Sequence, residues 1–252
     1  MGPPRARSSL GKLPKMAVDQ ALFEPSEAVR VLAIETSWSS GTVAAAEGER
    51  CLGQTELSAQ HRTAQSLAPA IAAQLAAAGW QPGDVQLVAV TVGPGSFTGL
   101  RIAVTTAKTF AYAVGAEVVG LNTLEVIAAQ APADQKEVWA VMDAQRQQLF
   151  CARFRQSGGQ LEVVRETTVV DRNSLLSLLD GDYAVSGPGL QSLQNQLPAR
   201  VFVVEQPLWT PQARTVAIMG HRAYRAGRRD NLWKLAPKYY RQSAAEEKLR
   251  QH

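Results

Sequence analysis

The 252-residue sequence has few cysteines and histidines and no long apolar run. No apolar stretch approaches the ~20 residues that a membrane-spanning helix needs, and the first thirty residues lack the apolar segment of a signal peptide. The two cysteines, Cys51 and Cys151, show no CxxC spacing, so we interpret them as free buried thiols in a reducing compartment. We therefore expect a cytoplasmic protein with no membrane contact.

The three histidines, His61, His221 and His252, are too far apart in sequence to form a local metal site. The helical neighbour of His61 four residues on is Gln65, whereas a helical metal site needs two ligands at this spacing. No Ser-His-Asp or Cys-His arrangement is visible either. We predict no metal site and no catalytic residue in this chain.

The sequence centres on residues 88–102, VAVTVGPGSFTGLRI. An apolar run that stops at glycines and a proline predicts a strand, a tight loop and the start of a helix. Ser96 or Thr98 can cap this helix, and its N-terminus favours an anion. The loop is not a phosphate-binding Walker A loop, because the glycine spacing differs and Leu100 stands where the lysine would be. A phosphate site and a plain structural turn both fit the pattern.

An apolar strand that ends in an acid and is followed by hairpin strands occurs twice, over residues 29–57 and again over 138–170. The acids are Glu35 and Asp143. The first turn, Glu35-Thr36-Ser37, can hold a metal-bound phosphate or simply satisfy backbone N–H groups. The repetition suggests two related halves, and alternating strands and helices predict an α/β fold of two layered subdomains.

These patterns divide the chain into four segments. Residues 1–28 lack periodicity and are expected to be disordered, with Met16 as a plausible alternative start. We assign 29–121 to the first subdomain and 122–210, with a helix over 190–196, to the second. Residues 211–252 then form a helix that packs back on the first subdomain, and a basic tail.

Two predicted helices carry stripes of alanine. Residues 58–78 place Leu67, Ile71 and Leu75 on one face, with Ala68, Ala72 and Ala76 beside them. Residues 98–115 carry a similar stripe at Ala103, Ala107 and Ala111. Small residues on one face allow close helix contact, so the stripes either pack on their own sheet or form a partner interface.

The net charge of +4 is concentrated near the C-terminus, because residues 218–252 hold nine Lys or Arg and three Asp or Glu. Aromatic residues, among them Tyr224, Trp233, Tyr239 and Tyr240, are interleaved with these charges. Such a segment can contact RNA, but a solvated helix face followed by a partner-binding strand fits it as well.

Taken together, four pieces of the sequence resemble the TsaB (YeaZ) family over residues 30–242. They are Glu35-Thr36-Ser37, the loop GPGSFTGLR at 93–101, the Asp143-Ala144 turn and Pro237-x-Tyr239-x-Arg241. The resemblance implies an actin-like, sugar kinase and Hsp70-type fold of two RNase H-like subdomains.

The resemblance also implies a role. Family members bind TsaD, which carries the active site, and with the ATPase TsaE support formation of threonylcarbamoyladenosine (t6A) at position 37 of tRNAs that read codons beginning with A. This chain would be a scaffold that contacts tRNA through the complex, with the alanine stripes named above as the TsaD interface. An isolated copy could pair with itself through these helices. No cofactor is implied for the isolated chain, whereas ATP or ADP could lie in the complex or at the partner interface.

Two departures from the family pattern bear on nucleotide binding. Glu35 replaces the usual Asp, and the Asp-Ala-Arg turn reads Asp143-Ala144-Gln145 with Arg146 one position on. A degenerate nucleotide site is still expected at Glu35, Thr36, Ser37, Gly95 and Ser96. The alternative function is an independent ATP-dependent kinase or ATPase of the same fold.

Overall fold

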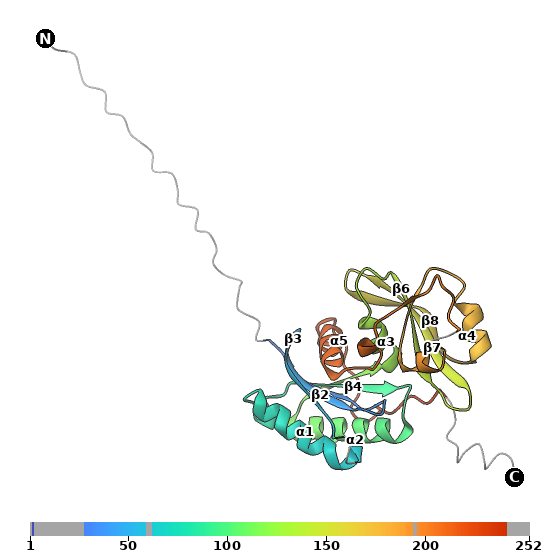
Figure 1. Cartoon of the computed structure of the whole chain (residues 1–252). Helices are drawn as coiled ribbons and strands as arrows, with labels where there is room; N and C mark the ends of the chain where they lie inside the picture. The colour runs from blue at the N-terminus through green and yellow to red at the C-terminus, as the bar shows by residue number, and fades with distance from the viewer. Residues whose placement is uncertain (1, 3–27, 59–61, 194–195, 241–252) are drawn as a thin grey trace.

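The computed structural model describes residues 2, 28–58, 62–193 and 196–240. Most of the segment predicted to be disordered, together with His61 and the residues beyond Tyr240, therefore lies outside the described ranges. The described residues form a pair of five-stranded sheets that lie one above the other, with helices between them (Figure 1).

The first sheet has the strand order β3-β2-β1-β4-β5. Its strands are β1 (Arg30–Glu35), β2 (Thr42–Glu47), β3 (Arg50–Glu56), β4 (Leu87–Gly93) and β5 (Glu117–Asn122). The central strand β1 runs antiparallel to β2 and parallel to β4. Helices cover both faces of this sheet, so β1 and β4 are continuous apolar runs that are almost fully buried.

The second sheet repeats this arrangement with the order β10-β9-β6-β7-β8. Its strands are β6 (Glu137–Asp143), β7 (Gln148–Ser157), β8 (Gln160–Asp171), β9 (Ala184–Ser186) and β10 (Phe202–Val203). Strand β6 takes the place of β1, antiparallel to β7 and parallel to β9. The predicted fold of two related halves is confirmed, and the shared strand order is that of an RNase H-like unit.

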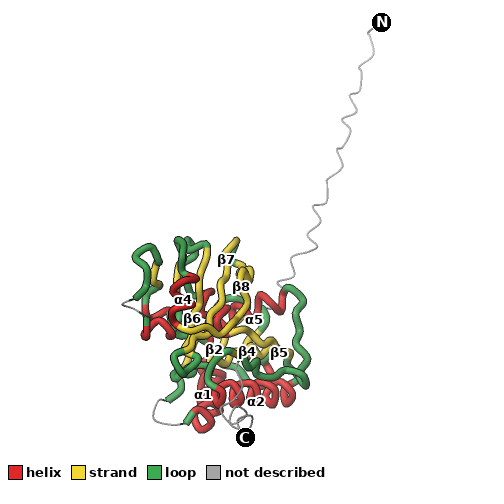
Figure 2. Tube along the Cα trace, turned by 90° about the vertical axis from the view of Figure 1, so that its right-hand side faces the viewer, coloured by secondary structure: helices red, strands yellow, loops and turns green. Residues whose placement is uncertain are grey.

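The helices occupy three places in the molecule (Figures 1 and 2). They are α1 (Thr63–Ala77), α2 (Phe97–Val114), α3 (Thr123–Ala129), α4 (Arg172–Leu178) and α5 (Ala213–Arg225). Helices α1 and α2 cover the outer face of the first sheet, and α4 packs on β7 and β8. Helices α3 and α5 lie between the sheets.

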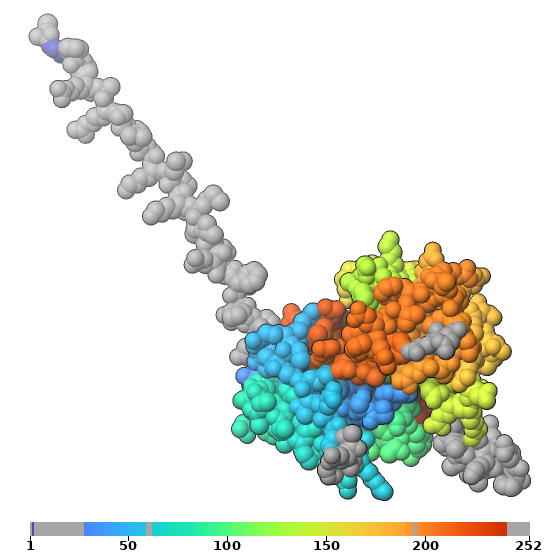
Figure 3. All heavy atoms as spheres, in the orientation of Figure 1, coloured from blue at the N-terminus to red at the C-terminus, as the bar shows by residue number. Residues whose placement is uncertain are grey.

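The helix that follows the last strand of each sheet packs against the other sheet. Helix α3 follows β5 but packs against β6 and β7, whereas α5 follows β10 but packs against β1, β2 and β4. The N-terminus of α5 is held by the first sheet, since the Ala213 amide donates to Thr42 Oγ1 at 2.9 Å. In the space-filling view the segment that leads into α5 lies directly beside the β2–β3 hairpin (Figure 3). The packing of α3 and α5 therefore holds together the two halves of the molecule, which we call lobes.

The second half departs from the sequence prediction in two places. Where a helix was expected over 190–196, the described residues form a 3-10 turn at Pro188–Ser192, the shorter counterpart of α2, and residues 194–195 lie outside the described ranges. Its start is pressed against the sheet, since a Cβ on Gly187 would lie 2.1 Å from the Val141 carbonyl oxygen. Helix α4 was not predicted, although its N-cap Asp171, which accepts from the Ser174 amide, is a recognisable start signal.

After α5 the chain forms a strap, residues 226–240, without regular secondary structure of its own. The strap crosses the edge of β5, where the Asp230 amide donates to the Val118 carbonyl at 3.0 Å. It then follows α2 and returns to the end of β4, where the Lys238 amide donates to the Val92 carbonyl at 2.7 Å. The strap therefore covers an edge strand whose backbone groups would otherwise be open to pairing.

Candidate functional site

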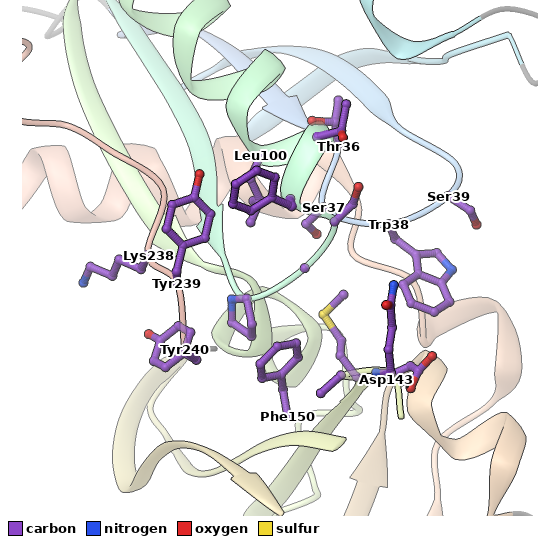
Figure 4. A pocket seen from close by; sticks show the side chains of 18 of the residues that line it. Thr36, Ser37, Trp38, Ser39, Leu100, Asp143, Phe150, Lys238, Tyr239 and Tyr240 are labelled. Atoms are coloured by element: carbon purple, nitrogen blue, oxygen red, sulfur yellow. Dashed lines mark hydrogen bonds between the residues drawn. The ribbon is translucent and has the colours of Figure 1, made fainter. Parts of the chain in front are cut away.

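A cleft of about 740 Å³ opens between the lobes at the ends of the central strands. Four segments line it: 36–39 after β1, the loop 94–98 before α2, the β6–β7 turn at 142–146, and the end of the strap at 238–240. Figure 4 shows Trp38 and Asp143 on one side and Lys238, Tyr239 and Tyr240 on the other. The resemblance includes Tyr239, but nothing in the sequence indicated that the strap would bring it to this cleft.

Glu35 does not reach the cleft. Its side chain is fully buried at the end of β1, and Oε1 accepts hydrogen bonds from the Ser37 amide at 2.7 Å, from Ser37 Oγ and from Thr91 Oγ1 at 3.2 Å. Burial raises the pKa of this carboxyl from 4.5 to about 7, although the Ser37 and Thr91 bonds lower it. Glu35 Oε1 therefore acts as an internal acceptor, whereas Oε2 is buried without a hydrogen-bond partner among the described residues, and the role of Glu35 toward a phosphate stays a prediction.

The two hydroxyls after Glu35 are also used internally. Thr36 Oγ1 donates to the Gly99 carbonyl at 2.7 Å, and Ser37 Oγ donates to Glu35. Both residues line the cleft, but they are almost fully buried. They join the end of β1 to the start of α2.

Polar groups of the glycine loop form hydrogen bonds within the chain. Ser96 caps α2, because its Oγ accepts from the Gly99 amide at 3.2 Å, and its own amide donates to the Ser37 carbonyl at 2.8 Å. A Cβ on Gly95 would lie 2.5 Å from that same carbonyl oxygen. The glycines therefore allow two backbone segments to touch. The structural interpretation of this loop fits better than a phosphate cradle.

These contacts decide whether the cleft fits the nucleotide that an actin-like fold implies. A phosphate with its metal needs an exposed acid and free backbone N–H groups at the helix start. Glu35 is enclosed, and the amides of Ser96 and Gly99 already have partners within the chain. The five residues predicted as a nucleotide site do lie close together, but these internal contacts do not favour a nucleotide there, and its binding stays a prediction.

The alanine stripes on α1 and α2 have opposite environments. Ala68, Ala72 and Ala76 are exposed on the outer face of α1. Ala103, Ala107 and Ala111 are 0%, 0% and 1% exposed and belong to the core beneath α2. The second stripe packs on its own sheet, so its predicted place in a partner interface is corrected.

The outer face of α1 carries no charge, although charged side chains usually cover the solvent side of a helix. None of the fifteen residues of α1 is charged. The neighbouring outward positions of α2, Thr105, Thr109 and Ala113, are exposed and uncharged as well. We call the exposed residues of α1 together with these three positions the α1–α2 face.

The described residues contain no helix that is long and apolar enough to cross a membrane. The same residues contain no group of three His, Cys, Asp or Glu side chains placed to hold a metal ion. Cys151 is buried, and burial raises the pKa of its thiol to about 11.

Comparison with known proteins agrees with this architecture. The model of the family "TsaD: tRNA N6-adenosine threonylcarbamoyltransferase" matches residues 55–248. The tRNA threonylcarbamoyladenosine biosynthesis protein TsaB of Bacillus subtilis is 28% identical over 187 residues, which cover 71% of this chain and 80% of that protein. TsaB of Escherichia coli is 27% identical over 172 residues, covering 65% and 73%.

Among solved structures, YeaZ from Pseudomonas aeruginosa superimposes with a TM-score of 0.74 at 23% identity, covering 84% of this chain and 99% of that one. This likeness shows that the two proteins share a fold. The resemblance to TsaB and YeaZ is thus confirmed by sequence and by structure. The chain belongs to the TsaD family, and within that family it is similar to the TsaB (YeaZ) proteins.

Proposed function

We propose that this chain is a non-catalytic scaffold subunit in t6A formation. It binds a TsaD protein and supports threonylcarbamoyl transfer to adenosine 37 of tRNAs that read codons beginning with A. Membership of the TsaD family and the names of its TsaB relatives support a role in this pathway. The scaffold role is supported by the α1–α2 face.

The α1–α2 face has the properties of a helix-docking surface. Ala68, Ala72 and Ala76 leave the backbone of α1 accessible along three turns, so a partner helix can approach closely. The face has no charge that a partner would have to desolvate. A TsaD protein that presents two similar helices would complete a four-helix contact here.

The remaining partners follow from this assembly. TsaE and tRNA join through the complex with TsaD, and an isolated copy of the chain pairs with a second copy through the same face. We assign any ATP or ADP to the complex or to the partner interface. The enclosed Glu35 carboxyl and the internally bonded glycine loop argue against a nucleotide in this chain's own cleft.

A reconstituted modification assay tests the proposed function. The threonylcarbamoyl-adenylate synthase, TsaD, TsaE and unmodified tRNA are combined with and without this chain, and t6A is quantified. The proposal expects t6A only when the chain is present, and none from the chain and the synthase alone. Full activity without the chain would contradict the scaffold role.

A further inference from the structure

We infer that the strap and the adjoining flank of α2 form an RNA-binding surface. We call it the strap surface, and its residues are Arg101, Tyr112, Trp233, Lys234, Lys238 and Tyr239. The inference rests on the proposed function for the identity of the RNA, which is tRNA. It adds a direct contact by this chain to a tRNA that the proposed function brings in only through the complex.

The charge of this region is almost entirely positive. The strap, residues 226–240, contains four Arg or Lys and one acid, Asp230. That acid is already engaged, because Asp230 Oδ2 accepts from the Gly120 amide at 2.7 Å and from Arg228 at 2.9 Å. Helix α2 adds Arg101 and Lys108 and contains no acid. A surface of this kind attracts a phosphate backbone.

Aromatic rings are exposed among these cations. Trp233 is 72% exposed and Tyr112 is 67% exposed, and their ring centroids lie 5.4 Å apart in an edge-to-face pair. Near the other end of α2, Tyr239 lies 4.8 Å from Phe97, and the Arg101 guanidinium covers the Phe97 ring at 3.8 Å. Exposed rings between cations are the arrangement on which unpaired bases stack while their phosphates are neutralised.

The strap surface is held in place before any ligand arrives. Lys108 Nζ donates to the carbonyls of Trp233 and Leu235 at 3.1 and 3.0 Å. Arg101 Nε donates to the Tyr239 hydroxyl at 3.0 Å. These bonds attach the strap to α2 at Trp233, Leu235 and Tyr239. Because the strap is already ordered, less conformational entropy is lost when a ligand binds.

The strap surface differs chemically from the α1–α2 face. The α1–α2 face is uncharged and lined with small side chains, whereas the strap surface carries cations and large rings. The first suits a close helix contact and the second suits a polyanion with flat bases. Helix α2 contributes to both, so TsaD bound to the first would hold the RNA near the second.

Fluorescence anisotropy with labelled, unmodified tRNA and the full chain tests the inference. Trp233→Ala should weaken binding by at least about fivefold through lost stacking. Lys234→Glu should weaken binding and reduce the slope of log affinity against log salt by about one or more. Matched controls come from the second lobe: Phe202→Ala, an exposed ring on β10, and Lys136→Glu, an exposed lysine before β6. Both controls should bind tRNA like the wild type.

A second measurement separates this inference from the proposed function. TsaD association of the same variants is followed by size-exclusion chromatography, and thermal unfolding confirms that each variant is folded. The inference expects both strap variants to bind TsaD normally. It is overturned by wild-type tRNA affinity in both variants, or by a loss of TsaD binding with tRNA affinity retained, which would make the strap a protein-binding surface. Failure of the wild-type chain to bind TsaD would instead count against the proposed function.

Discussion

Gly99 and Thr36 lie in direct backbone contact, which joins the start of α2 to the end of β1. Thr36 Oγ1 donates to the Gly99 carbonyl at 2.7 Å, and a Cβ on Gly99 would lie 1.9 Å from the Thr36 carbonyl oxygen. No side chain can occupy that position unless the helix or the strand moves. The last glycine of the central loop is therefore needed for packing.

Gly99→Ala should destabilise the protein by about 2 to 4 kcal/mol, because the added methyl group forces α2 away from β1. Urea unfolding monitored by circular dichroism measures the loss. Gly83→Ala is the matched control, since nothing lies within 4 Å of its new Cβ. If the two variants were equally stable, the packing role of Gly99 would be wrong.

Glu35 should make the stability of the fold depend on pH. The unfolded carboxyl ionises near its usual pKa of 4.5, whereas the folded carboxyl keeps its proton until about 7. Between these values the folded state binds more protons, so its stability falls as pH rises, by about 3 kcal/mol in total.

Glu35→Gln cannot ionise and should lose this component of the pH dependence. Unfolding free energies measured from about pH 4 to 8 give the slope. Glu166→Gln, at an exposed position on β8, should behave like the wild type. An unchanged slope in Glu35→Gln would show that the buried carboxyl is not the source.

Asp230 should hold the strap against β5. Asp230→Ala leaves the partly buried Gly120 amide without its 2.7 Å acceptor, which costs about 1 to 3 kcal/mol. Hydrogen exchange at the Gly120 amide should speed up, while Asp134→Ala, in an exposed loop, should leave it unchanged. Equal exchange rates in the two variants would mean that other contacts hold the strap.

Isothermal calorimetry of the isolated chain with Mg-ATP should show no saturable heat. The acid needed to hold a phosphate-bound metal is enclosed beside Ser37 and Thr91. Tight binding that Asp143→Asn weakens would place a nucleotide in the cleft and favour the alternative of an independent kinase or ATPase.

The sequence predicted the duplicated fold because its signal is local. The apolar runs at 31–34 and 138–142 each end in an acid before a hairpin, and they form β1 and β6, the central strands of the two sheets. The helix expected after residue 211 to pack back on the first subdomain corresponds to α5, whereas the path of the strap could be seen only in the structure. The path of the strap depends on contacts between residues about 100 positions apart, such as Asp230 with Gly120.

The candidate site was predicted less well. Glu35 resembled a ligand because it follows an apolar run, but β1 is a central strand, and its end is enclosed by β2 and β4. The two alanine stripes have the same spacing but opposite environments. In α2 the stripe shares its face with Leu100 and Val104, a pattern that already marks the core side, whereas in α1 Leu67, Ile71 and Leu75 occupy that side.

Whether an alanine stripe is buried or exposed decides which substitutions can test partner binding. Ala107 lies on the fully buried face of α2. Ala107→Arg should therefore prevent folding, because it forces a charge into the core. It cannot test the interface. Ala72 is exposed at the middle of α1, where an arginine is compatible with the fold but would keep a partner helix away.

The most direct test of the scaffold role is co-purification of the Ala72→Arg variant with TsaD. Ala133→Arg, which makes the same change at an exposed position between α3 and β6, is the control. We predict that Ala72→Arg keeps the wild-type melting temperature and no longer associates with TsaD, while Ala133→Arg associates normally. Undiminished association of a folded Ala72→Arg variant would contradict the assignment of the α1–α2 face to the partner.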